Sequence, residues 1–331
     1  MTRLTINIDI HADTVCPWCY IGKRNLDRAI AQFRTAHPDV DFKLVWRPYL
    51  LYPNAEVSGY QKGAGIAAIF GPGARAIFSR LDVAGAEHGI EFRWEGTSGN
   101  SRASHRLILL AAERDAAAAA AASSCSLTSS ASTTTTSAAK CCSSASTTTK
   151  PSSISGSNGT SSATGSRIQN AVIEAIFHGS FTMGEDASSP AFLASVATAN
   201  GLFLTEAEAL GWLSSSSSSP ILSEIITTIN TTGPDTATAA TEKEKAELSS
   251  AVAVDAESAR ARLELGISAV PSYVVQGRYR VGGMQGVDVF LGVFEKLYEL
   301  RERDRKRGEE EEGVGSTRQE GKRGVASAAV G

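Results

Sequence analysis

The chain has 331 residues, of which 42% are hydrophobic and 7% aromatic, so it is long enough for one large core or for two domains. Its 32 basic and 35 acidic residues give a formal net charge of −3, which does not support binding to nucleic acid or to an anionic membrane. We find no run of about 18 apolar residues that would span a membrane. The N-terminus also lacks a signal-peptide pattern, so we expect a cytoplasmic location.

The N-terminal segment alternates apolar and polar residues over positions 4–10, which is typical of a half-buried strand. The chain is then expected to turn at residues 11–14. A helix is predicted from Cys16, with Pro17 in its first turn, where a missing backbone N–H costs nothing. Apolar residues at helical spacing over 26–33 give this helix one face to bury.

Two cysteines, Cys16 and Cys19, flank Pro17 and Trp18 at the start of this predicted helix. Residues three apart in a helix lie one turn apart, within the Cα separation that a disulfide accepts. Unpaired backbone N–H groups and the positive end of the helix dipole favour a thiolate at Cys16. We interpret Cys16 as the nucleophile that attacks a disulfide and Cys19 as the resolving thiol. Trp18 is interpreted as a substrate contact, with a shielded aromatic at a helix start as the alternative.

The same pair could supply half of a zinc site, but zinc requires four ligands. The sequence contains no second C-x-x-C and no H-x-x-x-H pair, and the remaining cysteines, Cys125, Cys141 and Cys142, lie in low-complexity sequence. We therefore expect no metal and no other bound cofactor. A fixed structural disulfide is also disfavoured, because it would close a very short loop in a compartment that is expected to be reducing.

Two segments have compositions that do not favour a packed core. Residues 116–166 are almost entirely Ala, Ser, Thr and Gly, and they open with a run of alanine. Residues 303–331 are rich in charge and have no apolar period. Because few large apolar side chains are present to offset the entropy of ordering, we predict that both are disordered. A frayed helix is the alternative for the alanine start.

The two ends of the chain are predicted to form one mixed sheet. A second strand fits residues 42–46, and a β-hairpin with Gly277 in its turn fits residues 273–281, before a helical stripe over 287–298. The order strand, helix, strand, long excursion, hairpin, helix indicates an α/β fold with a mixed sheet. The excursion carries helical patterns at Ala74–His88, Ser101–Arg114, Ile168–His178, Ala191–Asn200, Glu206–Leu213 and Lys245–Leu265.

Stretches from both ends of the chain match the motifs of one known family. They are residues 13–22, which contain Cys-Pro-Trp-Cys, residues 46–51, residues 104–107, residues 266–272, which contain Val-Pro-Ser, and residues 281–285. Together they resemble the DsbA-like branch of the thioredoxin-fold oxidoreductases, and within it the FrnE-type group. The resemblance implies a thioredoxin fold interrupted by an all-helical domain. Its parts would be 1–54, the inserted helical domain 55–265, the returning part 266–302 and a charged tail 303–331.

The resemblance also implies a cis-proline that faces the active disulfide, which we carry onto Pro271, with Val270 beside it as a substrate contact. Physical chemistry agrees, because a cis bond is cheap only before proline. A missing N–H at a strand start also leaves a neighbouring backbone edge free to pair with an extended substrate. A trans-proline that begins an edge strand is the alternative.

The combined interpretation is an enzyme, a thiol–disulfide oxidoreductase whose partners are disulfide-containing or thiol substrates, with glutathione as a candidate reductant. One alternative is a glutathione-dependent isomerase or transferase. The kappa-class transferases and hydroxychromene carboxylate isomerases are similar in architecture but typically carry serine in place of the nucleophilic cysteine. A second alternative is chaperone-like binding by the helical domain. The direction of exchange, the substrate and the oligomeric state are not indicated by the sequence.

Three polar residues near these motifs each have two interpretations. His11 would favour a thiolate at Cys16 if it were protonated, or it would simply end the first strand. Asp13 would orient a water for proton transfer or hold the turn. His105 would act as a general base, or it would be hydrogen-bonded within a helical interface, which is the interpretation we favour.

Overall fold

The alternating N-terminal segment forms β1 (Leu4–Ala12), an inner strand of a four-stranded mixed sheet. β1 pairs in parallel with β2 (Val40–Pro48) and antiparallel with β5 (Ser272–Val275), which pairs antiparallel with β6 (Tyr279–Gly282). The predicted mixed sheet is therefore confirmed, in the order β2-β1-β5-β6. The structure is a computed structural model that describes residues 3–56, 59–128, 166–214 and 242–323.

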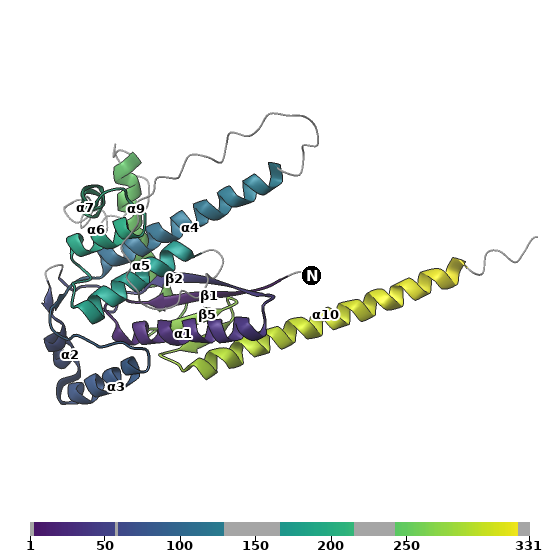
Figure 1. Ribbon diagram of the computed structural model, residues 1–331, viewed down its shortest axis with the longest axis horizontal. Coiled ribbons are helices and arrows are strands. Elements are labelled where there is room, and N and C mark those ends of the chain that lie inside the picture. The colour runs from purple at the N-terminus through teal and green to yellow at the C-terminus, as the bar shows by residue number, and fades with distance from the viewer. Residues whose placement is uncertain (1–2, 57–58, 129–165, 215–241, 324–331) are drawn as a thin grey trace, which may run out of the picture.

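One face of this sheet carries the core. The parallel register of β1 and β2 sets three apolar pairs side by side, so their side chains point to the same face: Ile6 with Phe42, Ile8 with Leu44 and Ile10 with Trp46. All six side chains are at most 2% exposed. Two helices cover this face, α1 (Pro17–Ala36) and α10 (Val287–Arg323), as Figure 1 shows. The rings of Phe33, Phe42 and Phe294 meet edge-on there, with centroids 4.8–6.1 Å apart.

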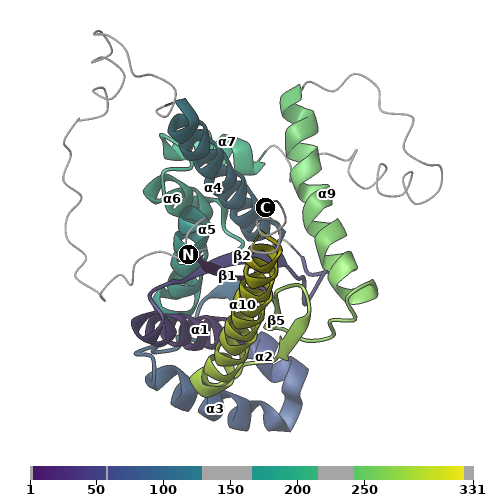
Figure 2. The same cartoon turned by 90° about the vertical axis from the view of Figure 1, so that its right-hand side faces the viewer.

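The segment between β2 and β5 is mostly helical. Its helices are α2 (Lys62–Phe70), α3 (Ala74–Ala86), α4 (Arg102–Thr128), α5 (Arg167–His178), α6 (Pro190–Ala199), α7 (Glu206–Ser214) and α9 (Glu242–Leu263). Two short strands pair with each other, β3 (Tyr60–Gln61) directly before α2 and β4 (Thr97–Ser98) before α4. In Figure 2, α4 to α7 gather on one side of the sheet and α9 stands on the other side of α4.

The helical segment and the sheet share one core. A single cluster of buried residues runs from Ile6 in β1 through Phe177 in α5 to Leu213 in α7. Asp115 of α4 also caps α5, because its carboxylate accepts the backbone N–H groups of Ile168 and Gln169 at 3.0 and 2.9 Å. The insertion is thus fastened to the sheet by packing as well as by its two connections. Within the described stretches, no helix has the length and apolar character needed to cross a bilayer.

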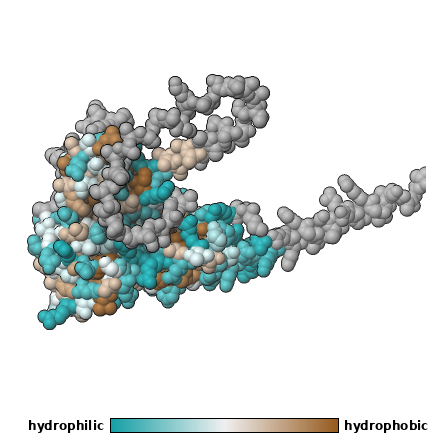
Figure 3. All heavy atoms as spheres, viewed as in Figure 1, coloured by the Kyte–Doolittle hydropathy of each residue, from teal (hydrophilic) through white to brown (hydrophobic). Residues whose placement is uncertain are grey.

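Parts of the two segments predicted to be disordered are helical: the prediction of disorder is wrong for residues 303–323, whereas at the alanine start the helix given as the alternative is the one observed. Residues 116–128 continue α4, because alanine has the highest helix propensity; residues 129–165 lie outside the described part. Residues 303–323 continue α10, where Arg305 and Arg307 form ion pairs with the acidic residues three positions earlier. Where this helix leaves the sheet, its surface is hydrophilic (Figure 3).

Candidate functional site

The candidate site lies where β1 ends and α1 begins. Cys16 is the N-cap residue of α1 and has an extended backbone, and Pro17 follows in the first turn, as predicted. The backbone N–H of Cys16 donates to Asp13 O at 3.1 Å, and that of Cys19 donates to Cys16 O at 3.0 Å. The turn is shorter than predicted, because residues 11 and 12 still pair within β1.

Burial distinguishes the two cysteines, which are both free thiols. Both residues are buried, but Cys16 keeps 5% of its surface exposed, whereas Cys19 has none. Burial raises the pKa of the Cys19 thiol well above its usual value, and the hydrogen bond with Cys16 and the charge of Cys16 add to the rise. Cys19 is therefore a protonated thiol in this structure, and only Cys16 retains contact with solvent.

The far end of the chain brings a proline to these sulfurs. The peptide bond between Val270 and Pro271 is cis, as the resemblance implied. The Sγ of Cys16 donates to the carbonyl oxygen of Val270 at 3.8 Å, across 254 positions of sequence. The ring of Pro271 faces Gly22 of α1, where an added Cβ would lie 3.0 Å from Pro271 Cγ. Four of the five predicted site residues thus come together at one point.

The fifth predicted residue, Trp18, lies half-buried at the edge of this point. The guanidinium of Arg80, on α3, lies over its ring at 5.5 Å from the centroid. Tyr52, which the sequence analysis did not single out, is 40% exposed on the loop after β2. Burial raises the pKa of Tyr52, and the charges of Tyr60 and Cys16 contribute to the rise. Trp18 and Tyr52 are partly exposed aromatic residues on the segments that follow β1 and β2.

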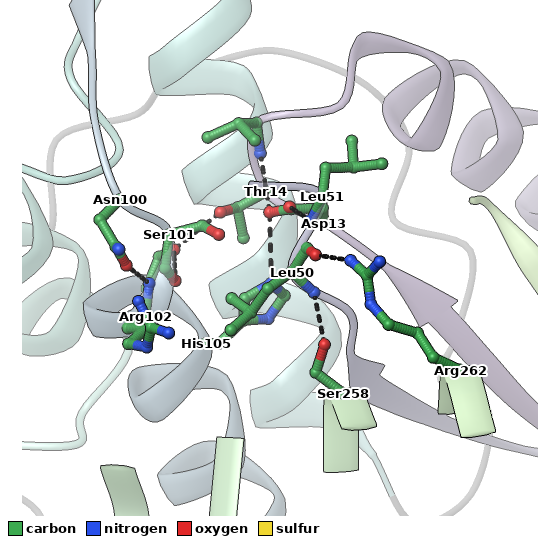
Figure 4. Close-up of polar contacts among 12 residues, drawn as sticks. Asp13, Thr14, Leu50, Leu51, Asn100, Ser101, Arg102, His105, Ser258 and Arg262 are labelled. Atoms are coloured by element: carbon green, nitrogen blue, oxygen red, sulfur yellow. Dashed lines mark hydrogen bonds and ion pairs between the residues drawn. The ribbon is translucent and has the colours of Figure 1, made fainter. Parts of the chain in front are cut away.

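A group of polar side chains holds the turn from the opposite side (Figure 4). The carboxylate of Asp13, fully buried, accepts the backbone N–H groups of Leu51 at 2.7 Å and Val15 at 3.3 Å. Its Oδ1 also lies 3.3 Å from Nε2 of His105, which comes from α4 and is 2% exposed. Asp13 therefore holds the turn, and His105 is hydrogen-bonded within a helical interface, as favoured above.

The same interface has further buried contacts. Thr14 Oγ1 and Ser104 Oγ share a hydrogen bond of 2.7 Å, and both side chains are fully buried. On the loop after β2, Leu50 donates its backbone N–H to Ser258 Oγ at 2.9 Å and accepts from Arg262, both on α9 (Figure 4). Helices α4 and α9 of the insertion thus fix the two loops that border the cysteines.

His11 does not supply a positive charge to the site. Its side chain is 2% exposed, and burial lowers its pKa from 6.5 to about 4, against a smaller opposing effect of Asp9. The imidazole is therefore neutral near pH 7, and the interpretation of a protonated His11 beside Cys16 is wrong. Its Nδ1 has no hydrogen-bond partner among the described residues.

Comparisons with known proteins bear on the fold. Residues 7–146 match the model of the DSBA-like thioredoxin domain family. A probable DsbA oxidoreductase from Streptomyces coelicolor has a similar structure, with 19% sequence identity, a TM-score of 0.52, and coverage of 89% of this chain and 90% of that chain. The expected thioredoxin fold is thus confirmed, and residues 7–146 match the DsbA-like family that the sequence resembles.

Two further solved structures are more distant. A protein from Nitrosomonas europaea is 13% identical, with a TM-score of 0.46 and coverage of 89% of this chain and 98% of that chain. A 2-hydroxychromene-2-carboxylate isomerase is 10% identical, with a TM-score of 0.38 and coverage of 91% and 98%. No curated protein matches the chain. Similarity at these identities concerns the fold, so the activity must be argued from the site.

Proposed function

We propose that the protein is a thiol–disulfide oxidoreductase of the DsbA type, within the FrnE-type group. One observation carries the proposal: the Sγ of Cys16 lies 3.8 Å from the carbonyl oxygen of Val270, beside the cis-proline Pro271 and one turn from a fully buried second thiol. This arrangement supplies one sulfur whose residue is 5% exposed, a second that is fully buried, and a backbone edge for an extended substrate within one site.

Disulfide exchange at this site proceeds in two steps. The thiolate of Cys16 attacks one sulfur of a substrate disulfide, and the other substrate sulfur leaves as a thiolate. Cys19 then attacks the Cys16 sulfur of the mixed disulfide, which releases the remaining substrate sulfur and leaves a disulfide between Cys16 and Cys19. The proton of the Cys19 thiol ends on the released substrate sulfur. In the reverse direction, the same steps oxidise a substrate dithiol to a disulfide.

The start of α1 supports the first step. Its unpaired backbone N–H groups and the positive end of the helix dipole favour negative charge at the capping position, which Cys16 occupies. Trp18 and Tyr52 offer apolar surface beside that sulfur. We propose that disulfide-containing or thiol substrates bind there, without a cofactor, nucleic acid or a membrane. A cytoplasmic location and glutathione as the reductant belong to the same proposal.

Trapping experiments with a model protein disulfide test this function. The unmodified chain is expected to reduce insulin in the presence of glutathione. Cys16→Ser should abolish turnover, whereas Cys19→Ser should accumulate a mixed disulfide between Cys16 and the substrate. Cys141→Ser, outside the Cys-Pro-Trp-Cys motif, is the matched control and should retain activity. Retained turnover in both Cys16→Ser and Cys19→Ser, or no mixed disulfide in Cys19→Ser, would contradict the proposal.

A further inference from the structure

The hydroxyl of Tyr273 is a buried polar group that the proposed mechanism does not use. Tyr273 lies in β5, two positions after Pro271, and its side chain is fully buried. Its Oη has no hydrogen-bond partner among the described residues. A buried hydroxyl without a partner costs about 1–3 kcal/mol, and phenylalanine would fill the same space without that cost. A tyrosine here therefore needs an explanation other than packing.

The position of the Tyr273 hydroxyl supplies this explanation. A Cβ added to Gly22 would overlap Tyr273 Oη, so the hydroxyl occupies the space that any other residue at position 22 would fill. Gly22 follows Cys19 by one turn of α1, and residues three apart lie on the same helix face. The ring of Tyr273 packs edge-on against Phe290 with centroids 4.9 Å apart. The phenol thus reaches α1 through a gap left by glycine, beside the resolving cysteine.

The electrostatics of this corner favour a donor. Burial raises the pKa of the Tyr273 hydroxyl well above its usual value, and the charges of Cys19, Asp27 and Cys16 add to the rise. The phenol is therefore protonated at any pH at which exchange is studied. Negative charge on the Cys19 sulfur needs a hydrogen-bond donor, because the residue is fully buried and burial disfavours the thiolate.

We propose that Tyr273 Oη–H donates a hydrogen bond to the Cys19 sulfur whenever that sulfur carries negative charge. The inference rests on the proposed function and names Tyr273 as a third catalytic residue. During reduction of a substrate, Cys19 loses its proton, attacks the mixed disulfide and forms the bond to Cys16, while the substrate thiolate leaves and takes up that proton. In the reverse direction Cys19 is the leaving group, so the same donor serves both.

Tyr273→Phe removes the hydroxyl and keeps the ring, so it isolates the hydrogen bond. The measurement is the rate at which a mixed disulfide on Cys16 is resolved, followed by rapid-quench electrophoresis with a model protein substrate. Hydrogen bonds to charged groups are worth about 1.5–3 kcal/mol, so resolution should slow at least about tenfold. Formation of the mixed disulfide by Cys16 should change less than about twofold. Tyr279→Phe, in the next strand, is the matched control and should resolve at the unmodified rate.

A second measurement does not depend on turnover. In a Cys16→Ser background, cysteine-selective carbon NMR reports the ionisation of Cys19. The charge of Asp13 also acts on the Cys19 thiol, and it is the same in both proteins compared. Adding Tyr273→Phe should raise the midpoint of that ionisation by about one pH unit or more, since one unit is about 1.4 kcal/mol. An unchanged midpoint, or unchanged resolution by a folded Tyr273→Phe protein, overturns the role of Tyr273 alone. Absence of any disulfide exchange in the unmodified chain overturns the proposed function. The ionisation measurement then still shows whether Tyr273 donates a hydrogen bond to the Cys19 thiolate.

Discussion

The start of α1 is held from two sides by different kinds of contact. On the side of the helical insertion, the Asp13 carboxylate accepts two backbone N–H groups and contacts His105, so the interaction is made of hydrogen bonds. On the side of β5, Pro271 and Tyr273 close onto Gly22 by packing, and the Tyr273 hydroxyl has no hydrogen-bond partner in the described part of the chain. The difference teaches that the polar side fixes where the cysteines stand, whereas the packed side determines the environment of the buried sulfur.

Removal of Asp13 should have the largest effect on stability. Asp13→Ala leaves two partly buried backbone N–H groups without their acceptor and the buried His105 Nε2 without its partner, and each unmade hydrogen bond costs about 1–3 kcal/mol. We expect a loss of about 3 kcal/mol or more in the free energy of unfolding, measured by urea denaturation. Asp39→Ala, which removes a carboxylate that is 44% exposed, is the control and should cost under about 1 kcal/mol. Comparable losses would mean that the polar side does not fix the turn.

A methyl group at Gly22 tests the packed side. Gly22→Ala places a Cβ against Tyr273 Oη and within 3.0 Å of Pro271 Cγ, so β5 and α1 must separate. We expect a net loss of about 1–3 kcal/mol together with slower disulfide exchange. Gly292→Ala, in α10 with no heavy atom near its added Cβ, is the matched control and should gain up to about 1 kcal/mol. Equal stability of the two variants would show that the packing at Gly22 is looser than the structure indicates.

His11 provides a pH-dependent test. Its folded pKa of about 4 lies below the unfolded value of 6.5, so the unfolded chain binds more protons between these values and stability falls as the pH falls through that window. The unmodified chain should lose about 1–2 kcal/mol from this residue between pH 7 and pH 5. His11→Leu should lose correspondingly less over the same range. The check is urea denaturation at both pH values, and parallel losses in the two proteins would rule out a buried neutral His11.

Much of the fold follows from local patterns. The alternation over 4–10 and the helical spacing over 26–33 and 287–298 predicted β1, α1 and the start of α10, because each buries one face against the same core. Helix α2 was not predicted, because its sequence is rich in glycine, which has low helix propensity. Tertiary packing decides the conformation of such a segment. The helix of the charged segment was missed, and that of the alanine-rich segment was predicted only as an alternative, for a different reason. They need little burial, because alanine propensity and ion pairs along the helix support them.

The site was predictable only where a motif spans it. Cys16, Cys19 and Pro271 were found because their motifs are specific as a pair. The contact of Asp13 with His105 joins positions 92 apart, and neither residue has a sequence pattern that indicates the other. Tyr273 also looks like an ordinary strand residue, because β-propensity favours tyrosine on any half-buried strand. Its importance arises from the glycine it faces, 251 positions away, and from the absence of a partner, both of which require the fold.

The smallest expected effect lies on the outer part of the polar side. Arg102 of α4 makes contacts of 2.8–3.1 Å with Asp255 of α9, but both side chains are about one-third exposed, at 32% and 35%. Solvent screens such a pair, so Asp255→Ala should cost under about 1 kcal/mol and leave disulfide exchange unchanged. A double-mutant cycle with Arg102→Ala measures the coupling. A coupling energy smaller than that between Asp13 and His105 would show that burial, rather than the number of contacts, decides which polar contacts fix the site. A coupling energy as large would show that the Arg102–Asp255 pair also fixes the site.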